Sequence, residues 1–370
     1  MRSPEDQRQL FAQVVLCVRG DRANSRRLLA NALRLSPTTA GQYVDQLLAS
    51  GHLAETGIER GRIGRPQRSL SVNPHAGWFA GIEFNAERLW AVRIDFSGTL
   101  QSQHSLKLPR NIDAGGVLEK IEYLVTQLSA ETTSPLLGIG IGAPGIVDPD
   151  QGIGIDYAFL PGWKHVPIAE TLQARFPAPV TLENNLRAIA LAERWFGGAQ
   201  HLTDYLILGP RAGFGVAVVI DGKPHRGTHW AAGEIGRWRW SGPGGTEAVH
   251  DRLTAPAAWR RLTGAAEDAP LPSDLRSALS AFAETPGQEW HALAADYALV
   301  IGHLQVLLDS RAAFLHGPVT ALGEPFCKAI VRQLPAECPP LELHPTILGD
   351  DAGALGAASL AMEAWRPEEP

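Results

Sequence analysis

Residues 181–185, with the sequence TLENN, bring together side chains that could do chemistry. The apolar residues before them predict a buried strand, and the spacing in LRAIALAERWFG predicts a helix directly afterwards. Glu183, Asn184 and Asn185 therefore stand at the carboxyl end of a strand, a position typical of active sites. A general base must be ionisable, and the amide of Asn185 is not. The three residues can still hydrogen-bond a ligand, or they can cap the following helix.

The composition is that of an ordinary globular protein. The 370 residues suffice for two or three domains, and 45% are hydrophobic and 19% charged. We find no apolar run of about 18 residues, and the opening MRSPEDQRQL lacks the apolar segment of a signal peptide. We therefore expect a cytoplasmic protein with no membrane partner. The spacing of Cys17, Cys327 and Cys338 argues against a disulfide scaffold and against a cysteine zinc cluster.

The charge of the chain is divided unevenly. Residues 1–73 carry 11 Arg, no Lys and 6 acidic residues, a net charge of +5. The remaining residues carry 22 basic and 33 acidic side chains, a net charge of −11. A basic segment on an acidic body favours an anionic partner for the N-terminal part.

The N-terminal part has the pattern of a helix-turn-helix. Helical spacing of apolar residues predicts helices over residues 4–18, from Asn24 or Ser25, and from Pro37 with Ser36 as its N-cap. The last helix keeps short polar side chains on the face opposite its apolar stripe, where they can approach base edges. Three-helix modules of other kinds share this pattern. The candidate DNA-binding residues of this helix are Ser36, Thr38, Thr39 and Gln42.

The segment HLAETGIERGRIGRPQRSLSV adds a wing to this module. It is typical of two short strands around a basic loop, which makes the whole a winged helix-turn-helix. A small, stiff, cationic loop tip can enter a narrow minor groove. The alternative is a basic loop that is simply solvated. The candidate DNA-binding residues of the wing are Arg62, Gly64, Arg65, Pro66 and Arg68.

Beyond residue 73 the chain predicts two similar α/β lobes. Three strands are predicted in 77–108, a helix near 113–130, a buried strand in LLGIGIGAPGIVD, a helix near 166–175 and a further strand in PVTLEN. The segment DYLILGPRAGFGVAVVIDG then restarts the same alternation. A repeated order of strands and helices favours two lobes with a cleft between them.

These segments resemble the ROK family of bacterial sugar kinases and sugar-responsive repressors. The resemblance rests on GIGIGAPGIVDPDQG, FLPGWKHVPIAETLQARFPAPVTLENN, GFGVAVVIDGKPHRGTHWAAGEIG and GDDAGALGAA, and RGRIGRPQRSLSVNP resembles the wing of the repressor branch. It implies an α/β fold: a two-lobed actin/hexokinase-like body, which is a duplicated RNase H-like fold, preceded by a winged helix-turn-helix domain. We expect a DNA-binding domain at 1–73, lobe 1 at 74–184 joined by the C-terminal helix 352–366, and lobe 2 at 185–351.

The chain departs from the family's kinases at the residues that do the chemistry. The resemblance places Asn185 where kinases carry the Asp that takes the proton of the sugar hydroxyl. The turns matching the two phosphate-binding loops read EFNAE (83–87) and GPRAG (209–213), and Pro210 lacks an N–H donor. Arg237 takes the position of the His that usually precedes a zinc cluster. We therefore expect no catalytic residue, no kinase activity, no cofactor and no metal.

Several family positions that contact the sugar are nevertheless retained. The candidate effector-binding residues are Gly145, Asn184, Asn185, Glu234, Arg237 and Glu247. Phe159 replaces a sugar-contacting Asn, and Arg237 adds a fixed cation, so we expect an unusual or acidic sugar, or a sugar phosphate. The expected function is a sugar-responsive repressor, a homodimer or homotetramer, with double-stranded operator DNA as partner. The alternatives are an ATP-dependent sugar kinase and a ligand-independent DNA-binding protein whose body only oligomerises.

Overall fold

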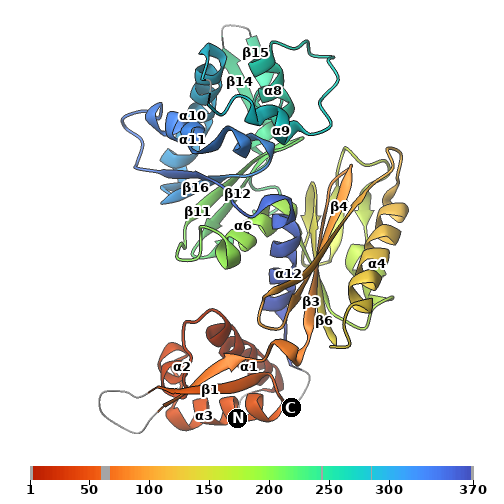
Figure 1. Ribbon diagram of the computed structural model, residues 1–370, viewed down its shortest axis with the longest axis vertical. Coiled ribbons are helices and arrows are strands. Elements are labelled where there is room, and N and C mark those ends of the chain that lie inside the picture. Colours follow the sequence, from red (N-terminus) through yellow and green to blue (C-terminus); the bar gives the residue numbers. More distant parts are fainter. Residues whose placement is uncertain (1–2, 60–66, 243–244, 285, 368–370) are drawn as a thin grey trace. The chain divides into compact units, whose positions relative to one another are not determined.

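The computed structural model describes residues 3–59, 67–242, 245–284 and 286–367 (Figure 1). The chain divides into two compact units. Unit 1 comprises residues 1–185 and 353–370, and unit 2 comprises residues 186–352. The chain therefore passes between the units twice, after Asn185 and after Ala352.

Unit 1 begins with three helices and a hairpin, here called the head. The helices are α1 (Pro4–Arg19), α2 (Arg26–Ala32) and α3 (Pro37–Ala49), and the hairpin pairs β1 (Leu53–Glu59) with β2 (Gln67–Val72) antiparallel. Each helix starts at a serine whose hydroxyl accepts a backbone N–H: Ser3 from Asp6, Ser25 from Leu28 and Ser36 from Thr39. The predicted helix-turn-helix and the strands of its wing are confirmed.

The rest of unit 1 is a mixed sheet with the strand order β10-β6-β3-β4-β5, here called the lobe 1 sheet. Strands β3, β6 and β10 are parallel, whereas β4 and β5 pair antiparallel. The predicted elements are present as β3 (Trp78–Phe84), β4 (Arg88–Asp95), β5 (Leu100–Lys107), α4 (Ala114–Ala130), β6 (Leu136–Ala143), α5 (Ile168–Gln173) and β10 (Val180–Asn184). A small sheet of β7 (Ile146–Asp148), β8 (Ile153–Asp156) and β9 (Lys164–Val166) was not predicted. A 3₁₀ turn, η1 (Pro74–Ala76), joins the head to β3.

The C-terminal helix α12 (Ala352–Ala364) packs directly on the lobe 1 sheet (Figure 1). A Cβ atom on Gly81 would lie 2.0 Å from the carbonyl oxygen of Ala354, and one on Gly140 would lie 1.7 Å from that of Ala357. Both positions need glycine because the helix backbone occupies the space of a side chain. The sequence therefore fixes α12 at backbone-to-backbone distance.

Unit 2 repeats the arrangement of the lobe 1 sheet. Its strand order is β13-β12-β11-β16-β17, with β11, β16 and β17 parallel and β12 and β13 antiparallel. The two sheets thus have the same order of antiparallel and parallel neighbours, which confirms the predicted duplicated α/β fold. The strands of this sheet are β11 (Tyr205–Pro210), β12 (Phe214–Ile220), β13 (Lys223–Pro224), β16 (Ala312–Leu315) and β17 (Glu342–Pro345). A separate hairpin pairs β14 (Arg239–Gly242) with β15 (Gly245–Ala248).

The helices of unit 2 pack around this sheet. They are α6 (Asn185–Phe196), α7 (Val249–Leu253), α8 (Ala255–Thr263), α9 (Leu275–Ser280), α10 (Gln288–Leu308) and α11 (Gly323–Arg332), with 3₁₀ turns η2 (Ile235–Arg237), η3 (Pro318–Leu322) and η4 (Gly349–Asp351). The expectation of no long apolar segment was wrong for α10. Among the described residues, this helix is long and apolar enough to cross a membrane by length and composition. Its Trp290, Leu293 and Tyr297 are buried in the core of unit 2, so α10 is a core helix there.

A carboxyl group is buried at the end of α6. Glu193 is fully buried; its Oε2 accepts the Gly198 N–H at 2.9 Å, and its Oε1 has no hydrogen-bond partner among the described residues. Burial raises the pKa of Glu193 above its ordinary value of 4.5, and the Gly198 N–H opposes this only in part. The folded state therefore binds a proton that the unfolded state releases, so this group makes the protein less stable as the pH rises above 4.5.

The substitution Glu193→Gln is predicted to remove this pH dependence. Glutamine keeps an acceptor for Gly198 and carries no charge, so it resembles the protonated acid. We expect the melting temperature of the variant to gain on that of the wild type as the pH is raised from about 5 to 8, with the two close together near pH 4.5. Thermal denaturation across that range measures the difference. A constant difference at all pH values would contradict a buried acid at this position.

A candidate DNA-binding surface and a candidate effector site

The exposed face of α3 carries the candidate base-contacting residues. Ser36 and Thr39 are used by the helix start, because the Ser36 hydroxyl accepts the Thr39 N–H at 3.1 Å and lies 2.7 Å from the Thr39 hydroxyl. Thr38 and Gln42 are exposed and lie four residues apart, so they share one face of the helix. Those two side chains are free to reach a base edge, whereas Ser36 and Thr39 hold the helix start in shape.

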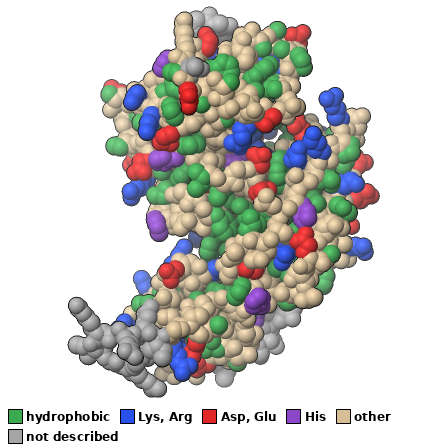
Figure 2. Space-filling model, viewed as in Figure 1, with side chains coloured by type: hydrophobic (Ala, Val, Ile, Leu, Met, Phe, Trp, Pro, Cys, Tyr) green, Lys and Arg blue, Asp and Glu red, His purple; other side chains and the backbone are tan. Residues whose placement is uncertain are grey.

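An ion-pair network fixes α3 against the wing strands. Arg26 on α2 bonds Asp45 on α3 at 2.6 Å and Glu55 on β1 at 2.9 Å, and Glu55 also pairs with Arg68 on β2. The hydrogen bonds from Arg68 and then from Arg26 lower the pKa of Glu55. The side chain of Arg68 remains 65% exposed. Figure 2 shows Arg side chains close to carboxylates on the visible face of the head, which contains no Lys.

The wing tip lies outside the described residues. This part of the chain includes Arg62, Gly64, Arg65 and Pro66, so their roles stay predictions from the sequence. The described strands β1 and β2 flank this segment on both sides, and Arg68 is the second residue of β2.

The candidate residues Glu183, Asn184 and Asn185 lie at the carboxyl end of β10 in unit 1. Glu183 and Asn184 are buried at the end of β10, and α6 starts at Asn185. The Glu183 carboxylate accepts the Asn184 backbone N–H at 2.8 Å, while the Asn184 side chain donates to the Gly145 carbonyl at 2.9 Å. Gly145 has a φ of 73°, and a Cβ there would lie 2.1 Å from the Asp156 carbonyl oxygen, so only glycine fits. Gly145 and Asn184 are thus brought together.

Asn185 contacts a residue of the first altered turn. Its side-chain amide donates to Glu83 Oε1 at 3.3 Å. Glu83 is 1% exposed, and Gly353 packs so closely on it that a Cβ would lie 2.5 Å from the Glu83 Cδ. The neighbouring Asn85 side chain accepts the N–H groups of Glu87 and Arg88 and closes the turn on itself. A buried glutamate side chain thus lies next to the Asn185 amide.

The second altered turn, in unit 2, also uses its own donors. The Arg211 N–H points to the carbonyls of Gly209 at 2.9 Å and Gly213 at 2.8 Å. Pro210 has no N–H to offer. A phosphate cradle needs backbone N–H groups that converge on the ligand. Neither Pro210 nor Arg211 therefore has a backbone N–H available for a phosphate.

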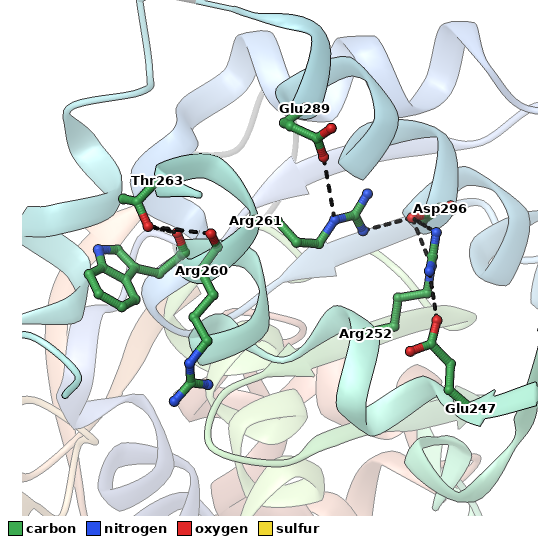
Figure 3. A network of polar contacts seen from close by, with 8 residues as sticks. Glu247, Arg252, Arg260, Arg261, Thr263, Glu289 and Asp296 are labelled. Carbon is green, nitrogen blue, oxygen red and sulfur yellow. Dashed lines mark hydrogen bonds and ion pairs between the residues drawn. The ribbon is translucent and has the colours of Figure 1, made fainter. Parts of the chain in front are cut away.

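The remaining candidate effector residues lie in unit 2. Glu234 is partly buried directly before η2, and Arg237 is exposed at the end of η2. Glu247 on β15 accepts a hydrogen bond from Arg252 at 2.6 Å, so its carboxylate is engaged in an ion pair (Figure 3). Sequence reasoning did not find this partner, because an Arg five residues further on becomes a neighbour only through the turn into α7.

Arg252 belongs to a larger network that anchors the β14–β15 hairpin (Figure 3). Asp296 on α10 accepts from Arg252 at 2.9 Å and from Arg261 on α8 at 2.7 Å. Its side chain is 12% exposed, so both bonds are shielded from water. Glu289 lies 3.9 Å from Arg261 and is 58% exposed. Asp296 is therefore the buried centre of the network. Among the described residues no group of three or more His, Cys, Asp or Glu side chains could hold a metal ion.

Sequence reasoning noticed Phe159 but missed its surroundings. Phe159 is 53% exposed, and its ring lies 5.4 Å from that of Tyr157. The residues on both sides of it line an open cavity of about 460 Å³ in unit 1. The residues lining this cavity are Asp156, Tyr157, Ala158, Leu160, Pro161, Gly162, Trp163 and Lys164. The aromatic residues of YAFLPGW were the available signal for it.

Comparison with known proteins gives consistent matches. The ROK family model matches residues 79–364. A xylose repressor of Caldicellulosiruptor bescii is 29% identical over 215 residues, which cover 57% of this chain and 54% of that protein. The chain thus spans about half the length of the curated relatives it matches.

Two solved structures share the fold. A ROK family transcriptional regulator, a homologue of the Escherichia coli MLC protein, superposes with a TM-score of 0.81 at 19% identity, over 97% of this chain and 96% of that one. A ROK family glucokinase from Streptomyces griseus, in complex with glucose and AMPPNP, superposes with a TM-score of 0.64 at 23% identity, over 77% of this chain and 99% of that one. The first likeness includes the head, and the second is confined to about the length of the body.

The Asp296 network yields a stability prediction. The substitution Asp296→Ala leaves two arginines without their shared acceptor, and we expect it to destabilise the protein by about 2–4 kcal/mol. The matched control Glu289→Ala removes only an exposed, long ion pair and should cost less than about 1 kcal/mol. Urea denaturation of both variants measures the difference. Equal losses would show that Asp296 does not anchor the hairpin.

Proposed function

The chain belongs to the ROK family, and from this premise we propose that it is a DNA-binding transcriptional repressor of sugar-metabolism genes. Its kinase-like body binds a sugar or sugar derivative without phosphorylating it. The observation that carries the proposal is the presence, on one chain, of a helix-turn-helix with an exposed polar face and a kinase-like strand end with Asn185 in place of the base. The xylose repressor and the ROK regulator structure support it by likeness.

The head supplies the DNA-binding surface. Thr38 and Gln42 on α3 would read a major groove, while Arg62, Arg65 and Arg68 of the wing would contact phosphates or the minor groove. Asp45, Arg26 and Glu55 hold the helix and the wing strands in one frame. Base contacts and phosphate contacts would then come from neighbouring parts of one surface.

The body supplies the effector site and lacks the chemistry of a kinase. In unit 1, Gly145, Asn184 and Asn185 would bind sugar hydroxyls. In unit 2, the candidate hydroxyl-binding residues are Glu234 and Glu247. The side chain of Asn185 can donate and accept hydrogen bonds but cannot remove a proton. In the two turns that match phosphate loops, Glu83 is a buried carboxylate and Pro210 lacks a donor. A negative group next to a triphosphate raises the energy of the bound nucleotide.

The exposed cation of Arg237 favours an acidic ligand. A guanidinium binds carboxylates and phosphates through two parallel hydrogen bonds. The ligand class is therefore a sugar acid or a sugar phosphate, with neutral sugars such as xylose as the comparison. Glu247 would reach the ligand only together with Arg252, its ion-pair partner, so the two residues would act as one unit.

The protein would act in the cytoplasm as a homodimer or homotetramer on two-fold operators, since a symmetric operator needs two heads. Its functional parts would be the DNA-binding domain 1–73, lobe 1 at 74–184 with 352–366, and lobe 2 at 185–351.

Binding to the DNA upstream of its own gene tests the repressor hypothesis. We expect selective binding with a steep salt dependence, altered by one member of a panel of sugars, sugar acids and sugar phosphates. Arg65→Ala should weaken binding on all sequences and reduce the slope of log affinity against log salt by about 1.

Gln42→Ala should instead relax sequence preference, at a cost of about 1–3 kcal/mol on the preferred site. The control Arg110→Ala, an exposed arginine outside the head, should change neither. Absence of selective binding would refute the assignment of the head.

Calorimetry with the same panel tests the effector site. We expect Arg237→Ala to weaken an acidic ligand at least about tenfold, the loss of one charge-assisted bidentate pair. The neighbouring Arg239→Ala serves as the control. ADP release from ATP and Mg²⁺ should stay at background for the wild type and also for Asn185→Asp, because both phosphate turns remain altered in that variant. Sustained turnover by the wild type would establish the kinase alternative. Unchanged affinity in Arg237→Ala would remove the acidic-ligand hypothesis.

A further inference from the structure

Arg19 joins the head to the lobe 1 sheet. It is the last residue of α1, and its guanidinium donates twice to the Phe96 carbonyl, from Nε at 2.9 Å and from Nη2 at 2.6 Å. The same group lies 4.8 Å from the centre of the Phe96 ring. Burial lowers the pKa of Arg19 to about 9, while Glu363 and Asp95 oppose the shift. The arginine remains charged at neutral pH and combines a bidentate hydrogen bond with a cation–π contact.

An aromatic cluster continues this joint. His52, in the turn between α3 and β1, lies 5.3 Å from the Phe96 ring and 5.0 Å from the Trp365 ring. Phe96 and Trp365 meet edge to face at 4.9 Å, and both are buried. Burial lowers the pKa of His52, so the ring is neutral at pH 7. Its Nδ1 lies within hydrogen-bonding distance, 2.8 Å, of the Ser50 hydroxyl. The cluster thus combines residues from the turn after α3, from the β4–β5 turn and from the segment after α12.

The linker between head and sheet is fastened on both sides. Asn73 donates its backbone N–H to the His52 carbonyl at 3.0 Å and its side-chain amide to the Gly51 carbonyl at 2.7 Å. The Phe96 N–H points to the Pro74 carbonyl at 3.4 Å. The head therefore meets the sheet through contacts over several residues and not through a single strand of chain.

Helix α12 connects this joint to the strand end of unit 1. Gly353, in its first turn, packs on Glu83, which in turn accepts from Asn185. Trp365 follows its last residue, and its ring lies tilted against that of His52. Its 13 residues span about 20 Å, and the glycine contacts with β3 and β6 prevent it from bending or sliding independently of the sheet. Figure 1 shows α12 running along β3 toward the head.

We infer that α12 is the element through which ligand binding at the strand end changes the position of the DNA-binding head, with Trp365 as its contact on the head. This inference rests on the proposed function. Both passages of the chain between the units, at Asn185 and at Gly353, lie beside Glu83. A change in the hydrogen bonding of Asn185 or Glu83 therefore acts on the first turn of α12, and a rigid helix carries that displacement to its other end.

The test compares Trp365→Ala with Trp365→Phe and with Tyr123→Ala, an exposed aromatic residue on α4 that is remote from the joint in sequence and contacts. Operator affinity is measured with and without saturating ligand, and ligand affinity is measured by calorimetry without DNA. In the wild type, the ratio of the two operator affinities is the coupling factor. On a logarithmic scale, we expect Trp365→Ala to lose at least two thirds of the coupling factor. Its affinity for the ligand should stay that of the wild type. Trp365→Phe keeps a ring on His52 and should retain most of it, and Tyr123→Ala should match the wild type.

A second readout keeps the inference decidable if Trp365→Ala folds poorly or if no sugar alters DNA binding. Backbone hydrogen exchange of residues 51–53 and 94–97 reports the joint directly. Arg19→Lys, which keeps the charge but not the bidentate bond, should raise exchange in both segments and leave α10 unchanged. Trp365→Phe, which keeps a ring against His52, should raise it less. Loss of protection confined to the two segments supports the joint. Wild-type coupling in Trp365→Ala, or unchanged exchange in Arg19→Lys, overturns the inference. A wild type that binds no operator refutes the repressor proposal itself and leaves the exchange result to decide on the joint.

Discussion

The contact between the backbone of α12 and the lobe 1 sheet determines how the rest of unit 1 is arranged. Gly81 and Gly140 leave no side chain between helix and sheet, so the carbonyls of Ala354 and Ala357 lie where Cβ atoms would be. Close packing of this kind has no slack, and a shift of the helix must move the sheet or the residues at its ends. The two ends of α12 meet Glu83 and His52, which belong to the candidate site and to the head.

The carboxyl end of β10 carries groups that can hydrogen-bond a hydroxyl, and residue 185 next to it is an amide and not a carboxylate. Asn184 still orders the Gly145 loop, and Glu183 still satisfies the N–H that begins the turn into α6. Ground-state binding of a hydroxyl needs hydrogen bonds alone, whereas proton transfer also needs a base of suitable pKa. The side chain of Asn185 can supply hydrogen bonds but cannot act as that base.

The sequence was sufficient for the elements whose signals are local. Serine caps fixed the starts of α2 and α3, alternating and continuous apolar runs gave the strands of both sheets, and glycines marked the turn at Gly145. Contacts between distant segments had no such signal. The pairing of Glu247 with Arg252 and the burial of Asp296 depend on how α7, α8 and α10 pack. Helix α10 was missed as a long apolar segment because Glu289 and Asp296 interrupt its pattern, although both serve the same ion-pair network.

The joint between head and body illustrates the same limit in its strongest form. Arg19, His52, Phe96 and Trp365 are spread over almost the whole chain, and each alone looks like an ordinary helix end or turn residue. Their meaning appears only when α1, the turn after α3, the β4–β5 turn and the end of α12 converge. The neutral ring of His52 packs against the rings of Phe96 and Trp365, and the charged guanidinium of Arg19 donates to the Phe96 carbonyl. Aromatic packing and directed hydrogen bonds together fix the orientation of the head on the lobe 1 sheet. A head held by one flexible linker would have no fixed orientation relative to the lobe 1 sheet.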